Sequence, residues 1–370
     1  MMTKMTDAVS DSDSHVRTMD LILDELSEAR RSGGQVVLYP HVRADGDALG
    51  GCFALARLLR KLDINSLVLL EEEVPEKFIF LPGLELAAIY DQADRAALLD
   101  RQCVAVAIDS HGADRLMSRE TLYDAAPVRM VIDHHVSELP VHPLYYKDTT
   151  ASAVCEMIGS FALHLEKREN RELMDLDIAT ALMAGIMTDT GRFSYSNVTA
   201  RTFSIASRLK AHGVRMNDLS ERLFDTMSPA RMRLIAVISA GVTYYYGGRL
   251  AVAQISLRDR EEAGARDDSD LDGLAAMLRT VEGVDVALLL TEAECGAVRG
   301  NLRSNAHFDS AAFARTLGGG GHVPAAGFTM ENTTLKAAWA HCVKAMKTSL
   351  GIKNPKVPFD VIRLDSDDER

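Results

Sequence analysis

The chain has 370 residues, which is too long for one ordinary domain and suits two. It is 47% hydrophobic and 25% charged, as soluble globular proteins are, and no apolar run reaches the roughly 18 residues that a membrane span needs. The formal net charge is −12, whereas proteins that grip long nucleic acid carry basic surfaces. We therefore expect neither a membrane nor a long nucleic acid as partner.

The start of the chain and the cysteines indicate where the protein works. Residues 1–15 are polar and mixed in charge, unlike a signal or transit peptide, and are expected to form a disordered lead-in. The five cysteines are scattered singly and include no CxxC pair, so neither a disulfide framework nor a zinc site is expected. The cytoplasm is the compartment that fits these features.

The first half of the chain alternates between short apolar strands and helices. Strands are expected over residues 35–40, 65–70, 103–108 and 128–132, and a helix over 47–61. Further helices are expected over residues 151–167, 176–188, 199–212 and 228–240. Strands separated by helices predict an α/β domain with a doubly wound, mainly parallel sheet over residues 16–225, followed by a helical linker over 226–240.

The second half predicts a smaller α/β domain over residues 241–352. Strands over 242–246 and 249–256 flank Gly247-Gly248, which favours a hairpin. A helix over 271–281, strands over 284–291 and 297–304, and a helix that begins at Asp309 and ends in the glycines 318–321 follow. A last amphipathic helix spans 334–350, and residues 353–370 form a polar tail.

Polar side chains follow three of the predicted strands, and one more polar group ends a helix. They are His41, Asp45 and Asp47; Asp109; Asp133, His134 and His135; and Asp189. Ligands of open parallel sheets bind beyond the carboxyl ends of the strands, so these segments are expected to converge on one crevice.

Convergence of Asp45, Asp47, Asp109 and Asp189 would require cations. Two like charges about 4 Å apart repel by roughly 4 kcal/mol at an effective dielectric of 20. Several such pairs would exceed the roughly 5–15 kcal/mol that holds a domain folded. Two divalent ions would balance the four carboxylates, with imidazole nitrogens as further ligands. Mixed oxygen and nitrogen ligands suit Mn²⁺, with Mg²⁺ or Co²⁺ as possible substitutes.

Each motif has an ordinary structural explanation when it is taken alone. An Asp-x-Asp after a strand is more often a helix cap than a ligand, an Asp-His-His can be a surface loop, and a glycine run usually ends a helix. Their order along the chain, however, resembles the four motifs of the DHH phosphoesterase family. The segment 319–327 (GGGHVPAAG) is similar to the signature of that family's associated C-terminal domain, and Leu302-Arg303-Ser304 is similar to its substrate-binding strand.

The resemblance covers about residues 20–350 and is closest to the bacterial nanoRNases and pAp phosphatases of the NrnA type. It implies one manganese on His41, Asp45 and Asp109. It implies a second manganese on Asp47, His134 and Asp189, with Asp109 bridging the two.

The resemblance also assigns catalytic and substrate-binding groups. His135 would touch the scissile phosphate or its leaving oxygen, and Asp109 and Asp133 complete the catalytic set. The far end of the substrate would be bound in the cleft between the domains by a second set: Arg303, Ser304, Gly320, Gly321 and His322. Two departures from the family pattern stand out, Ala44 for a common proline and Gly51 for a common serine.

The expected function is the manganese-dependent hydrolysis of oligoribonucleotides of about two to five nucleotides and of 3'-phosphoadenosine 5'-phosphate (pAp). The enzyme is expected to be a homodimer. A soluble phosphodiesterase for cyclic or linear dinucleotides is the main alternative. A non-catalytic nucleotide-binding protein is a further alternative, which loss of a metal ligand would signal, but all six expected ligands are present.

Overall fold

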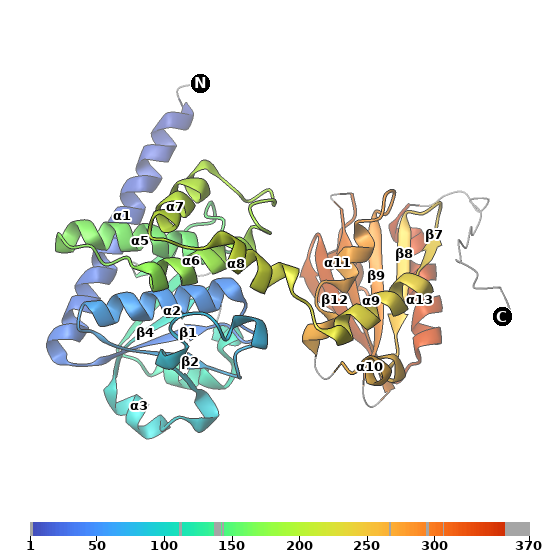
Figure 1. Cartoon of the computed structure of the whole chain (residues 1–370), viewed down its shortest axis with the longest axis horizontal. Helices are drawn as coiled ribbons and strands as arrows, with labels where there is room; N and C mark the ends of the chain where they lie inside the picture. Colours follow the sequence, from blue (N-terminus) through green and yellow to red (C-terminus); the bar gives the residue numbers. More distant parts are fainter. Residues whose placement is uncertain are drawn as a thin grey trace. The chain divides into compact units, whose positions relative to one another are not determined.

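The computed structural model describes residues 3–110, 113–136, 142, 144–265, 268–293, 296–305 and 307–351, with side chains from residue 14 onward. The chain divides into two compact units, unit 1 (Met1–Thr226) and unit 2 (Met227–Arg370), which Figure 1 draws in blue to green and in yellow to red. The polar tail expected over 353–370 lies outside the described residues. None of the helices described is both long and apolar enough to cross a membrane.

Unit 1 is built on a six-stranded sheet in which every pairing is parallel. The strand order is β3-β2-β1-β4-β5-β6. The strands are β1 (Gln35–Pro40), β2 (Asn65–Leu70), β3 (Ala87–Ile89), β4 (Gln102–Ile108), β5 (Val128–Asp133) and β6 (Tyr145–Lys147). The four strands expected from the sequence are therefore present, and two three-residue strands extend the sheet at its edges.

Helices cover both faces of this sheet because alternate side chains of its strands are buried on opposite sides. Val36 and Leu38 pack into the core formed with α1, α2, α5 and α6, whereas Val37 and Tyr39 pack into the core formed with α3 and α4. Figure 1 shows α2 and α3 on opposite sides of the strands. The helices are α1 (Thr3–Ser32), α2 (Gly46–Lys61), α3 (Arg95–Arg101), α4 (Glu120–Asp124), α5 (Val154–Glu169), α6 (Leu176–Asp189), α7 (Ala200–Ala211) and α8 (Met216–Ser220). The doubly wound α/β fold is confirmed.

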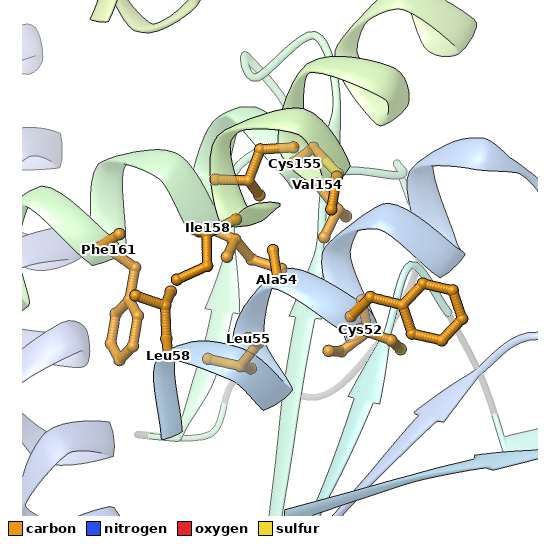
Figure 2. Close-up of a cluster of buried hydrophobic side chains, with 14 of the residues drawn as sticks. Cys52, Ala54, Leu55, Leu58, Val154, Cys155, Ile158 and Phe161 are labelled. Carbon is orange, nitrogen blue, oxygen red and sulfur yellow. The ribbon is translucent and has the colours of Figure 1, made fainter. Parts of the chain in front are cut away.

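Helix α2 is enclosed between the sheet and the helices α5 and α6. Apolar side chains of α5, among them Val154, Ile158 and Phe161, gather with Leu55 and Leu58 of α2 in the buried cluster that Figure 2 shows. All of these side chains are almost completely inaccessible to solvent. The start of α5 is therefore fixed against α2.

Two glycines let α2 and α6 approach closely. A Cβ added at Gly50 would lie 2.4 Å from the Ala181 carbonyl oxygen, and one at Gly185 would lie 2.8 Å from Asp47 Oδ1. Because early residues of α2 face late residues of α6, the two helices run antiparallel. The N-terminus of α2, with Asp47, is consequently brought to the C-terminus of α6, with Asp189.

Unit 2 is built on a mixed six-stranded sheet of order β11-β12-β10-β9-β8-β7. Only β8 and β9 pair in parallel, and the other pairs are antiparallel. The strands are β7 (Thr243–Tyr245), β8 (Leu250–Ile255), β9 (Val286–Ala293), β10 (Ala297–Ser304), β11 (Gly320–His322) and β12 (Ala325–Met330). The hairpin expected around Gly247-Gly248 is confirmed by the pairing of β7 with β8.

The helices of unit 2 pack on both faces of its sheet, over more strands on one face than on the other. On one face, α12 and α13 pack against apolar residues of β8, β9, β10 and β12. On the other, α9, α10 and α11 pack against β8 and β9, while Arg299 and Asn301 of β10 remain exposed. The helices are α9 (Pro229–Gly241), α10 (Leu257–Ala263), α11 (Leu274–Arg279), α12 (Ser310–Arg315) and α13 (Leu335–Ser349).

The strand β12 and the helices α3, α4, α8 and α10 were not expected from the sequence, and three further segments differ from what was expected there. Helix α1 covers residues 3–15, expected as a disordered lead-in; no glycine or proline interrupts the chain before Gly33. Helix α9, expected as a linker, belongs to unit 2 because its Leu234 and Ile238 are buried against β8. The glycine run does not simply end a helix, since α12 ends at Arg315 and residues 320–322 form strand β11.

Candidate active site

The strand order of unit 1 places a switch point between the neighbouring strands β1 and β4. After β1 the chain continues to β2, toward one edge of the sheet, and after β4 it continues to β5, toward the other edge. His41 directly follows β1 and Asp109 directly follows β4, and His41 Nε2 lies 3.6 Å from Asp109 Oδ2. The backbone of Asp109 is left-handed, with φ 56°, and its N–H donates to the Ile132 carbonyl at 2.9 Å. Such a conformation is uncommon outside glycine and is found at functional sites.

Asp45 is both a helix cap and a neighbour of the His41 ring. Its Oδ1 accepts the N–H groups of Asp47 at 3.0 Å and Ala48 at 3.1 Å, as the N-cap of α2. The same oxygen lies 3.9 Å from His41 Nε2. The side chain is 51% exposed, so the cluster is open to solvent on the side of Asp45.

Asp47 is completely buried and caps a different helix from the one that carries it. Its Oδ2 accepts the Val154 N–H at 2.5 Å and its Oδ1 accepts the Cys155 N–H at 2.9 Å. Ala153, the N-cap residue of α5, makes no side-chain cap bond, so the Asp47 carboxylate takes that role at the positive end of the α5 dipole. Asp47 is thus held rigidly between α2 and α5.

His134 lies at the centre of the carboxylates. Its Nε2 lies 3.3 Å from Asp189 Oδ2, 3.5 Å from Asp109 Oδ1 and 4.0 Å from Asp47 Oδ2. His134 Nε2 and Asp109 Oδ1 are buried without a hydrogen-bond partner, which is costly unless another group fills the space between them.

Backbone carbonyls orient both imidazoles. The Nδ1 of His41 lies 2.7 Å from the Val42 oxygen, and the Nδ1 of His134 lies 3.3 Å from the Ala151 oxygen. A carbonyl only accepts, so each Nδ1 carries a proton, and each Nε2 faces the carboxylate cluster. This is the orientation and second-sphere contact of metal-binding histidines. Sequence analysis missed these carbonyls, since a backbone group has no residue-type signal.

The atoms that could bind a metal include two adjoining groups. Within each group, the ligand atoms all lie within 4.8 Å of one another. The first contains His41, Asp45 and Asp109, and the second contains Asp47, His134 and Asp189. The structure therefore brings together the residues that the resemblance implies for two ions. The unpartnered His134 Nε2 and Asp109 Oδ1 fit divalent cations that are bound by imidazole nitrogen and carboxylate oxygen. Asp109 belongs to the first group and also lies next to His134 of the second group.

The protonation equilibria reflect the crowding of charge. Burial and the nearby carboxylates of Asp189 and Asp109 raise the pKa of Asp47 well above its usual range. Burial and the charges of Asp45 and Asp109 raise the pKa of Asp189 to about 6. Burial opposes protonation of His134, but Asp109 and Asp189 outweigh it and raise its pKa to about 12. The fold thus concentrates more negative charge than it neutralises, as a cation site requires.

His135 and Asp133 form a hydrogen-bonded pair beside the two donor groups. His135 Nδ1 lies 2.8 Å from Asp133 Oδ1 and 3.4 Å from Asp109 Oδ1. Asp133 is completely buried, whereas the His135 side chain is 29% exposed. Because a carboxylate accepts, the pair fixes the proton of His135 on Nδ1. His135, His134 and Asp109 also form a third group that could hold an ion.

The register of unit 2 sets Arg303 and His322 in one row of its sheet. Arg303 pairs with Ala325, and Ala325 pairs with His322 on its other side. Neighbouring strands are about 4.8 Å apart, so the two residues lie about 10 Å apart on the same face. His322 is exposed and Arg303 is half-buried. These two residues lie on the part of the sheet face that α9, α10 and α11 do not cover.

The other three residues expected to bind substrate in unit 2, Ser304, Gly320 and Gly321, differ in their surroundings. Ser304 is buried, and its hydroxyl lies within donating distance of two backbone carbonyls, that of Phe308 at 2.8 Å and that of Val323 at 3.1 Å. It therefore holds the chain directly after His322 instead of facing outward. Gly321 has φ 138°, and a Cβ there would lie 2.6 Å from the Ala325 oxygen. Gly320 has no atom within 4 Å of an added Cβ.

The departure at Gly51 has no consequence for phosphate contacts. A Cβ at this position would lie 3.0 Å from Ile158 Cδ1 and 3.3 Å from Ile108 Cγ2. A serine hydroxyl would therefore point into an apolar core and away from the carboxylates.

The doubly wound fold and the paired donor groups at its switch point define a phosphoesterase, a class of hydrolase. Residues 35–186 match the DHH family, N-terminal domain, and residues 247–348 match the DHHA1 domain. The chain belongs to the DHH family of phosphoesterases.

Known proteins resemble the chain over most of its length. It is 30% identical over 328 residues to the bifunctional oligoribonuclease and PAP phosphatase NrnA of Thermus thermophilus, covering 86% of this chain and 90% of that protein. It is 29% identical to the NrnA of Bacillus subtilis, covering 79% and 88%. The crystal structure of an exopolyphosphatase-related protein from Bacteroides fragilis has the same fold, with a TM-score of 0.80, 21% identity and coverage of 90% and 95%.

Proposed function

We propose that this enzyme hydrolyses phosphate esters in oligoribonucleotides of about two to five nucleotides and in pAp, with two manganese ions. The observation that carries the proposal is the pair of donor groups that adjoin at Asp109. The names of the NrnA relatives support the substrate class. The free cysteines Cys52, Cys103, Cys155 and Cys342 fit a reducing compartment, so we place the reaction in the cytoplasm.

Two Mn²⁺ ions would be held by the imidazoles and carboxylates of the two donor groups. The mixed oxygen and nitrogen set favours Mn²⁺ over Mg²⁺, which prefers oxygen alone, and over structural zinc, which prefers sulfur. When bound, the ions would lower the pKa of a shared water and neutralise charge that develops on the phosphate.

The protein's own groups would hold and orient the phosphate. We propose that His135 contacts the scissile phosphate or its leaving oxygen, in the orientation that Asp133 fixes through the Nδ1 hydrogen bond. We propose that Arg303 and His322 bind the substrate through unit 2, because a guanidinium can hold a phosphate through two parallel hydrogen bonds. The backbone at Gly320 allows close approach of a ligand, since no side chain stands there.

Substrate length should matter because the chain repels polyanions. With a net charge of −12, long-range attraction to a long strand is absent, and few counterions would be released on binding. A dinucleotide carries few phosphates and is repelled far less. Short substrates should therefore be degraded fastest.

Hydrolysis assays on purified protein test the proposal. We expect Mn²⁺-dependent cleavage of pAp and of the linear dinucleotide pApA, abolished by chelation, and at least about tenfold slower cleavage of a roughly 20-nucleotide strand. Faster turnover of a cyclic dinucleotide than of pApA and pAp would favour the cyclic-dinucleotide phosphodiesterase instead. Binding of these nucleotides without any hydrolysis would contradict an enzymatic role.

A further inference from the structure

The segment of residues 148–155, which leads into and begins α5, supplies backbone groups to two of the proposed metal ligands and is linked to a third through Asn197. Its Ala151 carbonyl orients His134, and its Val154 and Cys155 N–H groups hold Asp47. Its Ser152 carbonyl accepts an N–H of Asn197 at 2.9 Å; the same Asn197 amide nitrogen donates to the Asp189 carbonyl at 3.1 Å. The position of this one segment therefore sets the positions of His134, Asp47 and Asp189.

A buried carboxylate fixes this segment. Glu156 is completely buried in the first turn of α5. Its Oε2 accepts the Ser152 hydroxyl at 2.6 Å, within the segment, and the Thr202 hydroxyl at 2.7 Å, from the first turn of α7. Its Oε1 accepts the Nε–H of Arg201, which is also in the first turn of α7. Glu156 consequently joins the start of α5 to the start of α7.

Arg201 extends the same network to the other end of the segment. Its Nη1 lies 2.7 Å from Asp148 Oδ2, and Asp148 is almost completely buried. The Asp148 N–H donates to the Asp133 carbonyl at 3.1 Å. One guanidinium, 39% exposed, thus pairs with two buried carboxylates that flank Ala151 and Ser152.

We infer that Glu156, Arg201 and Asp148 form a positioning network for the metal centre, holding residues 148–155 so that His134, Asp47 and Asp189 keep their ligand geometry. Helices α5 and α6 already meet α7 through buried apolar groups, including Ile205. Buried ion pairs add little stability relative to apolar contacts of the same volume, so fold stability alone does not account for two buried carboxylates here. Partners in the second coordination sphere, by contrast, fix how ligands point. The inference rests on the metal ligands proposed above, and it extends to residues outside them.

Titration of the metal-free full-length protein with Mn²⁺ alone tests the network. Arg201→Met removes the guanidinium and keeps the bulk of the stem, and we expect Mn²⁺ affinity to fall about 10- to 100-fold in calorimetry. Arg168→Met is the matched control. Arg168 lies at the far end of α5, is 35% exposed and pairs with Asp20 and Asp24 of α1. The control should bind Mn²⁺ within about twofold of the unchanged protein.

Thermal unfolding without metal separates positioning from folding. Arg201→Met should melt at a lower temperature than Arg168→Met, because it leaves two buried carboxylates without their cation, but both variants should be folded at the temperature of the titration, with weaker Mn²⁺ binding only in Arg201→Met. Equal Mn²⁺ affinity in the two variants would overturn the inference. If Arg201→Met does not fold, Glu156→Gln provides the test, since the amide keeps the shape but can accept only on one side; unchanged Mn²⁺ affinity in a folded Glu156→Gln would equally overturn it. No substrate enters these measurements, so a wrong substrate assignment would leave them unaffected.

Discussion

The two sites of this chain are built in opposite ways. At the switch point of the unit 1 sheet, Asp47, Asp109 and His41 are buried, and backbone N–H or carbonyl groups fix Asp47 and His41. On the unit 2 sheet, the residues 320–322 are exposed on an edge strand, and His322 and Arg303 share one row of an uncovered face. We propose that both sets of residues act on phosphate, but only the first is enclosed by the fold.

The difference follows from what each site must do. Carboxylates that repel one another keep a shared geometry only if the surrounding structure fixes them, so the donors of unit 1 need partners on several elements. A side chain that binds an anionic substrate must be accessible from solvent. The register of a strand is enough to place such a side chain on the exposed face of a sheet. Loss of a buried group should therefore remove metal binding, whereas loss of an exposed group should affect only substrate binding.

The largest expected effect is at Asp109, which adjoins both donor groups. We expect Asp109→Ala to lower turnover by about 1000-fold or more and to abolish tight binding of both ions, because one change removes a ligand of each. Asp124→Ala, an exposed carboxylate paired with Arg129, is the control and should keep full activity. Manganese titration with turnover measurement checks both. Normal turnover of Asp109→Ala at ordinary manganese levels would contradict the assignment.

His135 tests whether a residue beside the donors acts on the phosphate instead of the metal. His135→Ala should lower kcat by about 100- to 10,000-fold, as loss of a positioned acid–base or hydrogen-bonding group does, and leave Mn²⁺ affinity unchanged. Parallel measurements of kcat and of Mn²⁺ binding decide the question. An equal fall in both would make His135 a ligand, together with Asp109 and His134.

Arg303 tests the exposed face. Arg303→Ala should raise the KM for short substrates about 10- to 100-fold, if one charged hydrogen bond contributes roughly 1.5–3 kcal/mol, with no change in Mn²⁺ affinity. Arg299→Ala is a close control, because Arg299 lies on the same face of β10 but pairs with Asp268 at 2.7 Å. Steady-state kinetics on pApA should show a much smaller change in the control; equal effects would mean that only the general charge of the face matters.

The smallest effect distinguishes two adjacent glycines. Gly321→Ala should destabilise unit 2 by about 1–3 kcal/mol, because the backbone is left-handed and the added methyl meets the Ala325 oxygen. Gly320→Ala should change stability by less than about 0.5 kcal/mol, since nothing lies near its Cβ. Thermal unfolding measures both. A raised KM in Gly320→Ala at unchanged melting temperature would assign that glycine to ligand contact, and an unchanged KM would remove it from the site.

The sequence predicted the donor residues and every long strand except β12, but it missed most of the short elements. β1, β2 and β10 have the expected bounds, and Asp309 caps α12 through the Ala312 N–H as expected. The strands β3, β6 and β11 were missed, because three residues show no periodicity. The six-residue strand β12 was also missed, since it follows a glycine run and begins with Ala-Ala-Gly, which are poor strand formers. Helix α1 was missed over its whole length; its first half is polar, and apolar spacing is the main signal of a helix.

For the site, residue types identified the candidate ligands, while their surroundings required coordinates. Nothing in the sequence indicates that the Val42 and Ala151 carbonyls orient the imidazoles, or that Asp47 caps a helix more than 100 residues away. The role of Glu156 was equally hidden, because a glutamate in the first turn of a helix is common on any surface. At Ser304, by contrast, the sequence motif predicted a substrate-binding residue, whereas its hydroxyl is bonded to a backbone carbonyl of the same unit.

The sheets described above share one property at their margins: each edge strand, β3 and β6 in unit 1 and β7 and β11 in unit 2, is three residues long. An edge strand exposes unpaired N–H and C=O groups that another chain can pair with, and shortness is one of the ways in which proteins prevent it. A ladder of three residues offers few bonds to an incoming strand, and in β11 two of the three residues are glycine. The protein therefore keeps open backbone groups along β11 while offering little template for aggregation.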